Sequence, residues 1–103
     1  MAKAVRMTYA TAAVLHALAD ERAYGFDIAA ATGLRRGTVY PILRRLEEAG
    51  MLVGEWETSE ASQQEGRPAR RYYRLNGSGA ELARTAAERY PAAAMVIAPR
   101  SGG

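Results

Sequence analysis

Residues 38–49 are the most informative segment of the chain: Thr38-Val39-Tyr40-Pro41-Ile42-Leu43-Arg44-Arg45-Leu46-Glu47-Glu48-Ala49. Its aliphatic side chains recur at helical spacing, and at ~100° per residue they fall within one narrow arc that must face a core. The opposite face carries Tyr40, Pro41, Arg44 and Arg45. We expect Thr38 to cap this helix, with Pro41 in the first turn, where its missing N–H costs little. The stretch therefore predicts a helix with one buried side and one basic, aromatic side open to solvent.

The elements around this helix complete a short alternating pattern. Apolar periodicity predicts helices over 8–19 and 25–31, and Gly33 stands where a left-handed helix cap is commonly required. Residues 52–57 and 70–75 have the alternation of strands, with Trp56 expected to anchor the core, and the polar residues 58–68 between them predict a flexible hairpin loop. A last helix runs from about residue 78 until Pro91 ends or kinks it. The fold class is mainly α with a small β-hairpin, a winged helix-turn-helix.

The composition limits the chemistry that the chain can perform. With 103 residues it fits one domain, and with one Phe and one Trp its core must be thin. The absence of cysteine excludes disulfides and thiolate metal sites, and the lone His16 cannot build a metal site by itself, so we expect no metal and no cofactor. No glycine-rich phosphate loop and no nucleophile–base arrangement is present, so we expect no enzyme. His16 is expected to have a packing or surface role.

The N-terminus and the hydropathy suggest a compartment. No apolar run approaches the roughly 20 residues of a membrane span. The basic N-terminal residues are not followed by a charge-free apolar stretch with a cleavage site, as in a signal peptide. We therefore expect a cytoplasmic protein without membrane contact.

Positive charge is concentrated in two places. The net charge is only +3, but the windows 35–45 and 66–74 each hold four arginines and no acid. Local positive charge of this kind suits a phosphate backbone, because binding a polyanion releases counterions. Double-stranded DNA is therefore the expected partner. The predicted contacts are Arg35, Arg36, Thr38, Tyr40, Pro41, Arg44, Arg45, Arg67, Arg70 and Arg71.

Each predicted contact has a role and an alternative. We expect the basic helix to enter the major groove, with Arg44 on a guanine edge and Arg45 on a phosphate. Arg35 and Arg36, in the turn, would clamp phosphates, and the hairpin arginines would follow the flanking backbone or enter the minor groove. Alternatively, Arg44 and Arg45 pair with the carboxylates of their own helix, and Arg70 pairs across the hairpin with Glu55 or Glu57. A winged-helix module that contacts proteins without binding DNA is the alternative function.

Three motifs carry a resemblance to a known family. They are 24–28 (Tyr-Gly-Phe-Asp-Ile), 37–52 (Gly-Thr-Val-Tyr-Pro-Ile-Leu-Arg-Arg-Leu-Glu-Glu-Ala-Gly-Met-Leu) and 66–75 (Gly-Arg-Pro-Ala-Arg-Arg-Tyr-Tyr-Arg-Leu). In this order, within a match over roughly residues 9–83, the chain resembles the PadR family of bacterial transcriptional regulators. The resemblance implies a winged-helix DNA-binding domain with a C-terminal dimerisation helix. It also implies a repressor that binds inverted repeats, released in some members by small phenolic or drug-like effectors. Pro91 departs from the family's single long C-terminal helix.

The domain boundaries and the dimer follow from these expectations. Residues 1–76 would form the DNA-binding domain, 77–98 the dimerisation helix and 99–103 a disordered tail. A homodimer is expected because the core is small and because two-fold symmetry matches palindromic operators; the alternative is a last helix that folds back on its own domain. The predicted interface stripe is Leu82, Ala86, Tyr90, Ala93 and Ile97. A small aromatic effector could occupy a dimer cavity lined by Tyr90, Met95 and the first helix.

Overall fold

Three helices form the helix-turn-helix half of the molecule. The computed structural model describes residues 5–20 and 24–95, with α1 at Tyr9–Ala19, α2 at Gly25–Thr32 and α3 at Arg36–Glu48. The hydroxyl of Thr8 accepts from the backbone N–H of Thr11 at 3.1 Å and so caps α1. Gly33 ends α2 in the left-handed conformation, with φ of 75°. The prediction for Gly33 is confirmed, since a side chain would be strained there.

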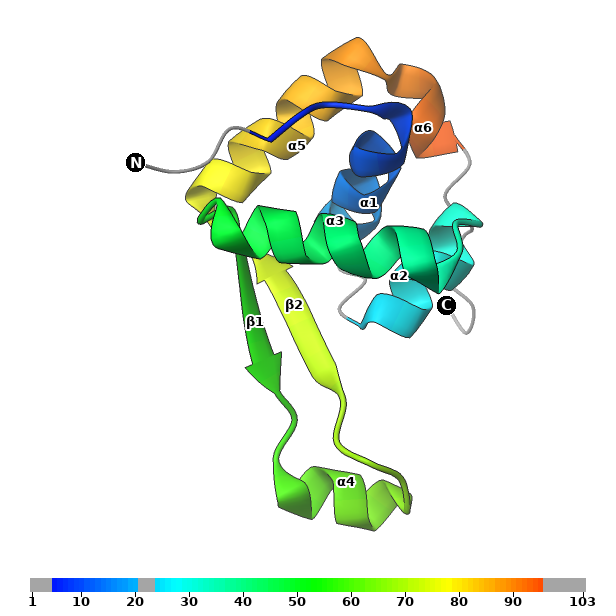
Figure 1. The fold of residues 1–103 in the computed structure, drawn as a ribbon, viewed down its shortest axis with the longest axis vertical. Helices are drawn as coiled ribbons and strands as arrows, with labels where there is room; N and C mark the ends of the chain where they lie inside the picture. Colours follow the sequence, from blue (N-terminus) through cyan, green and yellow to red (C-terminus); the bar gives the residue numbers. More distant parts are fainter. Residues whose placement is uncertain (1–4, 21–23, 96–103) are drawn as a thin grey trace.

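A two-stranded antiparallel hairpin follows α3 and projects from the helical body (Figure 1). Strand β1 is Leu52–Trp56 and β2 is Arg71–Leu75, and their register pairs Leu52 with Leu75 and Trp56 with Arg71. An isolated bridge between Tyr24 and Tyr72 ties the outer edge of β2 to the start of α2. The hairpin is therefore held to the helices at its base, while its far end stands clear of them.

The connection between the strands contains a helix, so the prediction of a flexible loop over residues 58–68 is wrong. Helix α4 spans Ser59–Glu65 and lies at the far end of the hairpin (Figure 1). Its N-terminus is capped by the Thr58 hydroxyl, which accepts from the N–H of Ala61 at 3.1 Å. Gly66 ends it with φ of 66°. Both cap signals are present in the sequence, and the polar composition of the segment obscured them.

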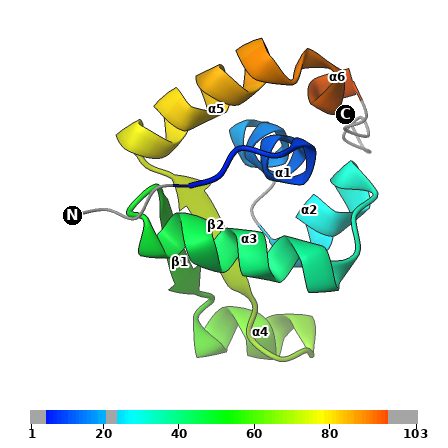
Figure 2. The same cartoon turned by 45° about the horizontal axis from the view of Figure 1, so that its top comes forward.

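The C-terminal part is divided as the position of Pro91 predicts. Helix α5 spans Gly77–Arg89 and α6 spans Pro91–Met95. The Asn76 side chain joins α5 to the hairpin, because its Oδ1 accepts from the N–H of Gly79 at 2.9 Å and its Nδ2 donates to the carbonyl of Gly50. Both helices pack on α1, on the side away from α3 (Figure 2).

Alanine fills much of the single hydrophobic core. Its largest fully buried side chains come from all three N-terminal helices: Leu15, Ile28, Leu43, Leu46, Val14 and Val39. Small side chains allow close approach between elements, most clearly at Gly79, where an added Cβ would collide with the carbonyl oxygen of Met51. Trp56 lies outside this core with 64% of its surface exposed, so its predicted role as a core anchor is wrong. Trp56 is the last residue of β1 and lies beyond the helices that bury Leu52 at the start of the strand.

Candidate nucleic-acid interface

Helix α3 has the two faces that its sequence predicts. Val39, Ile42, Leu43 and Leu46 are buried, whereas Arg36, Thr38, Tyr40, Arg44 and Arg45 are exposed and Pro41 is half-buried. Arg35, just before the helix, is also exposed. Within residues 5–20 and 24–95, no carboxylate forms an ion pair with Arg44 or Arg45. The alternative in which these two arginines pair along their own helix is therefore not seen, and their guanidinium groups can meet an external anion.

The start of α3 differs from the prediction. The helix begins at Arg36 rather than after a Thr38 cap, and the extended Arg35 at its N-cap makes no side-chain cap bond. The carbonyl of Arg35 accepts from the N–H groups of Thr38 and Val39 at 2.9 and 3.0 Å. Pro41 consequently lies in the second turn, where its missing N–H leaves the carbonyl of the exposed Gly37 to water. The Thr38 hydroxyl, not used for capping, remains available at the surface.

Tyr40 fixes the contact between α2 and α3. A Cβ added to Gly25 would lie 2.6 Å from Cε1 and 2.7 Å from the hydroxyl oxygen of Tyr40, so the ring lies directly on this glycine. Even so, 43% of the surface of Tyr40 remains exposed. Gly25 therefore lets the aromatic ring pack against α2 while its edge stays at the surface beside the arginines.

The hairpin arginines are in different surroundings, since three of them are paired within the chain. Arg67 donates to both carboxylate oxygens of Glu57, at 2.5 and 2.9 Å. This hydrogen-bonded pairing holds the pKa of the Glu57 carboxyl below its ordinary value and raises the pKa of Arg67. Arg74 meets Glu55 at 3.2 Å. The two pairs lower the net positive charge that the hairpin presents.

Arg71 links the hairpin to α3. Its Nη2 donates to Oε2 of Glu47 at 2.7 Å, and its guanidinium carbon lies 5.4 Å from the centre of the Trp56 ring and 5.9 Å from that of Tyr73. Burial raises the pKa of the Tyr73 hydroxyl. Arg71, predicted as a DNA contact, is thus held by one carboxylate and two aromatic rings of its own chain.

Arg70 is the exposed arginine of the predicted hairpin contacts. Its guanidinium carbon lies 5.1 Å from the centre of the Tyr24 ring, which in turn packs edge-on against Tyr72 at 6.2 Å between centroids. Only its backbone N–H approaches Glu57, at 3.4 Å, so the predicted alternative of a cross-hairpin side-chain ion pair is not seen in the described residues. Arg70 stands beside the junction of α2 and the hairpin, and its side chain forms no ion pair within the described residues.

A hollow of about 790 Å³ brings one further arginine to α3. Its lining includes Arg6, from the segment before α1, and Thr38, Pro41, Arg45 and Glu48 of α3. Sequence reasoning did not include Arg6 among the candidate contacts. Its signal was a basic residue shortly before the first helix, but nothing local indicated that the segment returns to α3.

The stripe predicted as a dimer interface lies against the chain's own core. Ala86 and Ala93 are fully buried, and Leu82 and Tyr90 are partly buried against the same cluster. Ile97 falls outside the described residues. Because α5 and α6 pack on α1, as in the alternative of a helix that folds back, Ala86 and Ala93 have no surface left for a partner.

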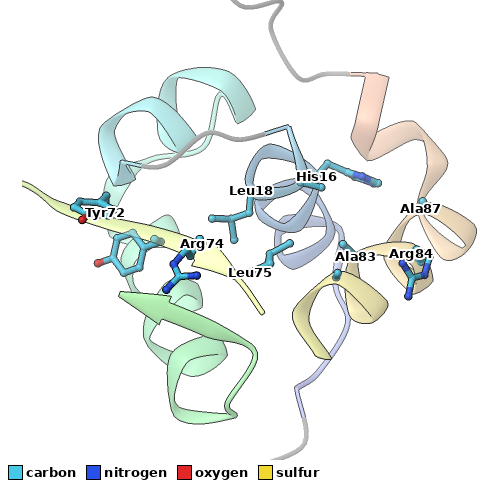
Figure 3. A pocket seen from close by; sticks show the side chains of 11 residues that line it. His16, Leu18, Tyr72, Arg74, Leu75, Ala83, Arg84 and Ala87 are labelled. Carbon is cyan, nitrogen blue, oxygen red and sulfur yellow. The ribbon is translucent and has the colours of Figure 1, made fainter. Parts of the chain in front are cut away.

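A second hollow, of about 780 Å³, lies between α1, β2 and α5 (Figure 3). Its lining includes His16, Tyr72, Leu75, Ala83 and Arg84, whereas Tyr90 and Met95, predicted to line an effector cavity, are not part of it. Within the described part of the chain, the buried Nε2 of His16 has no hydrogen-bond partner. This hollow is mainly apolar with polar groups from three elements at its edge.

Two further features concern the described residues: clusters of metal-ligating side chains and helices long enough to span a membrane. No group of three or more metal-ligating side chains occurs there. None of the helices described is long and apolar enough to cross a membrane.

Fold and surface together define a class of protein. Three helices, with the third exposing an aromatic and basic face, and a hairpin attached beside it form a winged helix-turn-helix of the kind that binds DNA. The model of the PadR-like family of transcriptional regulators matches residues 14–85, more than half of the chain. The chain belongs to this family, whose members are transcription regulators that bind DNA and are not enzymes.

Solved structures are similar to the chain over most of its length. A PadR family transcription regulator from Clostridium difficile R20291 has a TM-score of 0.67 and 22% identity, covering 86% of this chain and 94% of its own. A PadR-like transcription factor from Bacteroides fragilis has a TM-score of 0.60 and 28% identity, with 80% of each chain covered. None of the curated proteins compared with the chain is significantly similar to it. The prediction of a mainly helical winged-helix fold is confirmed.

Proposed function

We propose that this PadR-family regulator is a sequence-specific repressor in the bacterial cytoplasm, binding an inverted-repeat operator in double-stranded DNA as a homodimer. The observation that carries the proposal is the exposed face of α3, where Arg44 and Arg45 have no carboxylate partner in residues 5–20 and 24–95. A protein-binding surface would more often place apolar anchors and few charges at this position. The face matches the major groove in shape and in charge.

The roles of the residues follow from their positions on α3. Arg44 lies opposite the buried face, so it points most directly into a groove and can bond the O6 and N7 of a guanine. Arg45 shares a hollow with Arg6, and this pair suits one phosphate of the flanking backbone. Tyr40 and Thr38 contact the backbone beside them, and Arg35 and Arg36 approach the same strand from the turn. Arg70 extends the contact toward the hairpin.

The homodimer is proposed on the physical ground that one recognition helix reads too few base pairs to find a site in a genome. Since Ala86 and Ala93 are used inside the chain, the partner surface must consist of other residues of the C-terminal region. Met95, with 85% of its surface exposed at the end of α6, is the first candidate. Repression is proposed because the resemblance to the PadR family implies a repressor.

Selection of bound fragments from random duplex DNA tests the proposal most directly. We expect the recovered sequences to contain an inverted repeat whose half-sites are one helical turn apart, or a multiple of it. Affinity for the selected duplex should weaken steeply as the salt concentration rises, because phosphate contacts release counterions. Absence of binding at low salt would contradict the proposal and favour the alternative of a protein-binding module.

An effector site is a further part of the proposal. The hollow between α1, β2 and α5 has the size of a small-molecule site, and its lining includes the polar side chains of His16, Tyr72 and Arg84 (Figure 3). A small planar aromatic compound with a polar substituent fits this lining. A thermal-shift screen with such compounds should find stabilisation that His16→Ala reduces. If no compound stabilises the protein, the effector part fails while DNA binding is unaffected.

A further inference from the structure

Trp56 is the largest side chain that the protein leaves uncovered on its hairpin. It is the only tryptophan of the chain, and 64% of its surface is exposed. Tryptophan is enriched at interfaces, because its indole combines a large apolar face with one N–H donor. Exposure alone does not identify a partner, since single exposed apolar residues are common on protein surfaces. The direction of the side chain is more informative.

Trp56 lies on the face of the hairpin that looks toward α3. Alternate residues of a strand share a face, so Trp56 is on the same side as the buried Leu52. Its cross-strand partner is Arg71, whose guanidinium reaches Glu47 on α3 at 2.7 Å. The indole therefore continues, along the hairpin, the surface that begins with the exposed side of α3.

The indole is held in place from one side. The Arg71 guanidinium carbon lies 5.4 Å from the centre of the Trp56 ring, close enough for a cation–π contact. Gly54 lies two residues before Trp56, on the same face of β1. It leaves room for the Arg71 side chain, because an added Cβ would lie 2.8 Å from Nη2 of Arg71. Glu47, Arg71 and Trp56 thus form a chain of contacts from α3 to the hairpin, while the other side of the indole stays open.

We propose that Trp56 is a DNA contact of the hairpin and that Arg71 is its positioning residue. The apolar face of the indole packs on a deoxyribose beside the major groove, and its Nε1–H donates to a phosphate oxygen. Arg71, neutralised by Glu47, fixes the angle of the indole relative to α3 and makes no phosphate contact of its own. The partner of Trp56 is the same DNA duplex that α3 binds, because the surface continuous with Trp56 is the one that carries Arg44. The inference rests on the proposed function.

The fluorescence of the single tryptophan reports this contact without labelling. On addition of an unlabelled duplex carrying the selected operator, we expect the emission of Trp56 to shift and its quenching by acrylamide to fall. Trp56→Ala should weaken operator binding roughly tenfold, and Trp56→Phe, which keeps the apolar face but loses the N–H donor, should weaken it less. Tyr9→Ala is the matched control, since Tyr9 is also an exposed aromatic residue but lies at the start of α1, outside both the hairpin and α3, and the affinity of this variant should be unchanged.

Each other outcome counts against a specific statement. If the protein binds duplex and Arg44→Ala weakens binding while the Trp56 signal and the affinity of Trp56→Ala stay unchanged, the inference is overturned and the proposed function survives. If no duplex binds at low salt, both are overturned. If the emission shifts with protein concentration in the absence of DNA, Trp56 lies in an interface between copies of the chain, and the inference is again overturned.

The role of Arg71 has its own readout. For Arg71→Met we expect stronger acrylamide quenching of Trp56 in the free protein and a several-fold loss of affinity, with an unchanged dependence of affinity on salt. A direct phosphate contact by Arg71 would instead reduce the salt slope by about 1. Glu47→Gln, which keeps an acceptor for Arg71, should retain more of the affinity than Glu47→Ala. A reduced slope for Arg71→Met would overturn the positioning role.

Discussion

The arginines of α3 and those of the hairpin come from equally basic windows of the sequence, yet they lie in opposite surroundings. On α3, Arg44 and Arg45 face solvent, and the described residues offer them no ion pair. On the hairpin, Arg67 and Arg71 are bound to carboxylates at 2.5 and 2.7 Å. Local charge density therefore does not identify a DNA-binding surface. What matters is which carboxylates the fold brings next to each guanidinium.

The largest expected effect tests this difference between α3 and the hairpin. The double variant Arg44→Ala, Arg45→Ala should weaken operator binding by about 3 kcal/mol, more than hundredfold, because it removes a base contact and a phosphate contact. Its matched control is Arg67→Ala, Arg74→Ala, which removes the same charge from the hairpin and should cost only a few-fold. Titrations at several salt concentrations measure both. Equal losses in the two variants would erase the distinction.

The second prediction concerns the base of the hairpin, which determines where it stands relative to α3. Gly79→Ala places a Cβ against the carbonyl of Met51, at the start of β1, and 2.9 Å from Cδ2 of Leu75. We expect a loss of about 2 to 3 kcal/mol in the free energy of unfolding, measured with urea, because the backbone must shift. Gly77→Ala, where a Cβ meets nothing within 4 Å, should be neutral or slightly stabilising. Similar values for both alanines would show that Gly79 does not mark a close approach.

The third prediction uses the paired state of the hairpin. Arg67 holds the pKa of Glu57 below its ordinary value of 4.5. A lowered folded-state pKa contributes stability that is present above 4.5 and is lost as the pH falls through the folded pKa. Glu57→Gln should therefore lower the urea midpoint at neutral pH, and this difference should shrink as the pH falls below 4.5 and through the lowered pKa of Glu57, where the wild-type carboxylate also loses its charge. A deficit of the variant that persists in acid would mean that the carboxylate charge is not the cause.

The smallest effect is expected for the outermost ion pair. Arg74 and Glu55 are largely exposed at 3.2 Å, so solvent and salt screen their attraction. Arg74→Ala should change the free energy of unfolding by no more than about 0.5 kcal/mol. A larger change, measured by urea denaturation at low and high salt, would indicate that this pair supports the hairpin more than its exposure suggests.

The sequence anticipated the elements better than the contacts between them. The two faces of α3, the left-handed cap at Gly33 and the break at Pro91 follow from signals within one or two helical turns. Helix α4 was missed although Thr58 and Gly66 cap it, because a short polar helix lacks the apolar periodicity that predicts helices. The placement of Trp56 was wrong because its hydrophobicity says nothing about how far β1 extends beyond the helices.

The candidate site divides in the same way. The exposed residues of α3 could be predicted because helical periodicity separates them from Ile42 and Leu46. The pairing of Arg71 with Glu47 could not, since these residues are 24 positions apart and meet only when the hairpin returns to α3. The stripe with Ala86 and Ala93 was apolar as predicted, but periodicity cannot tell whether such a stripe is covered by α1 or by a second copy.

From the sequence it was possible to predict the left-handed cap at Gly33, the break at Pro91, the aliphatic side of α3, and the resemblance to DNA-binding regulators of the PadR type. The tertiary structure alone decided which arginines keep their charge available, that Trp56 stays uncovered beside α3, and that α5 and α6 close the core of their own chain. The physical reason is range. Caps and periodicity act over about four residues, whereas ion pairs and burial depend on which distant segments the packing brings together.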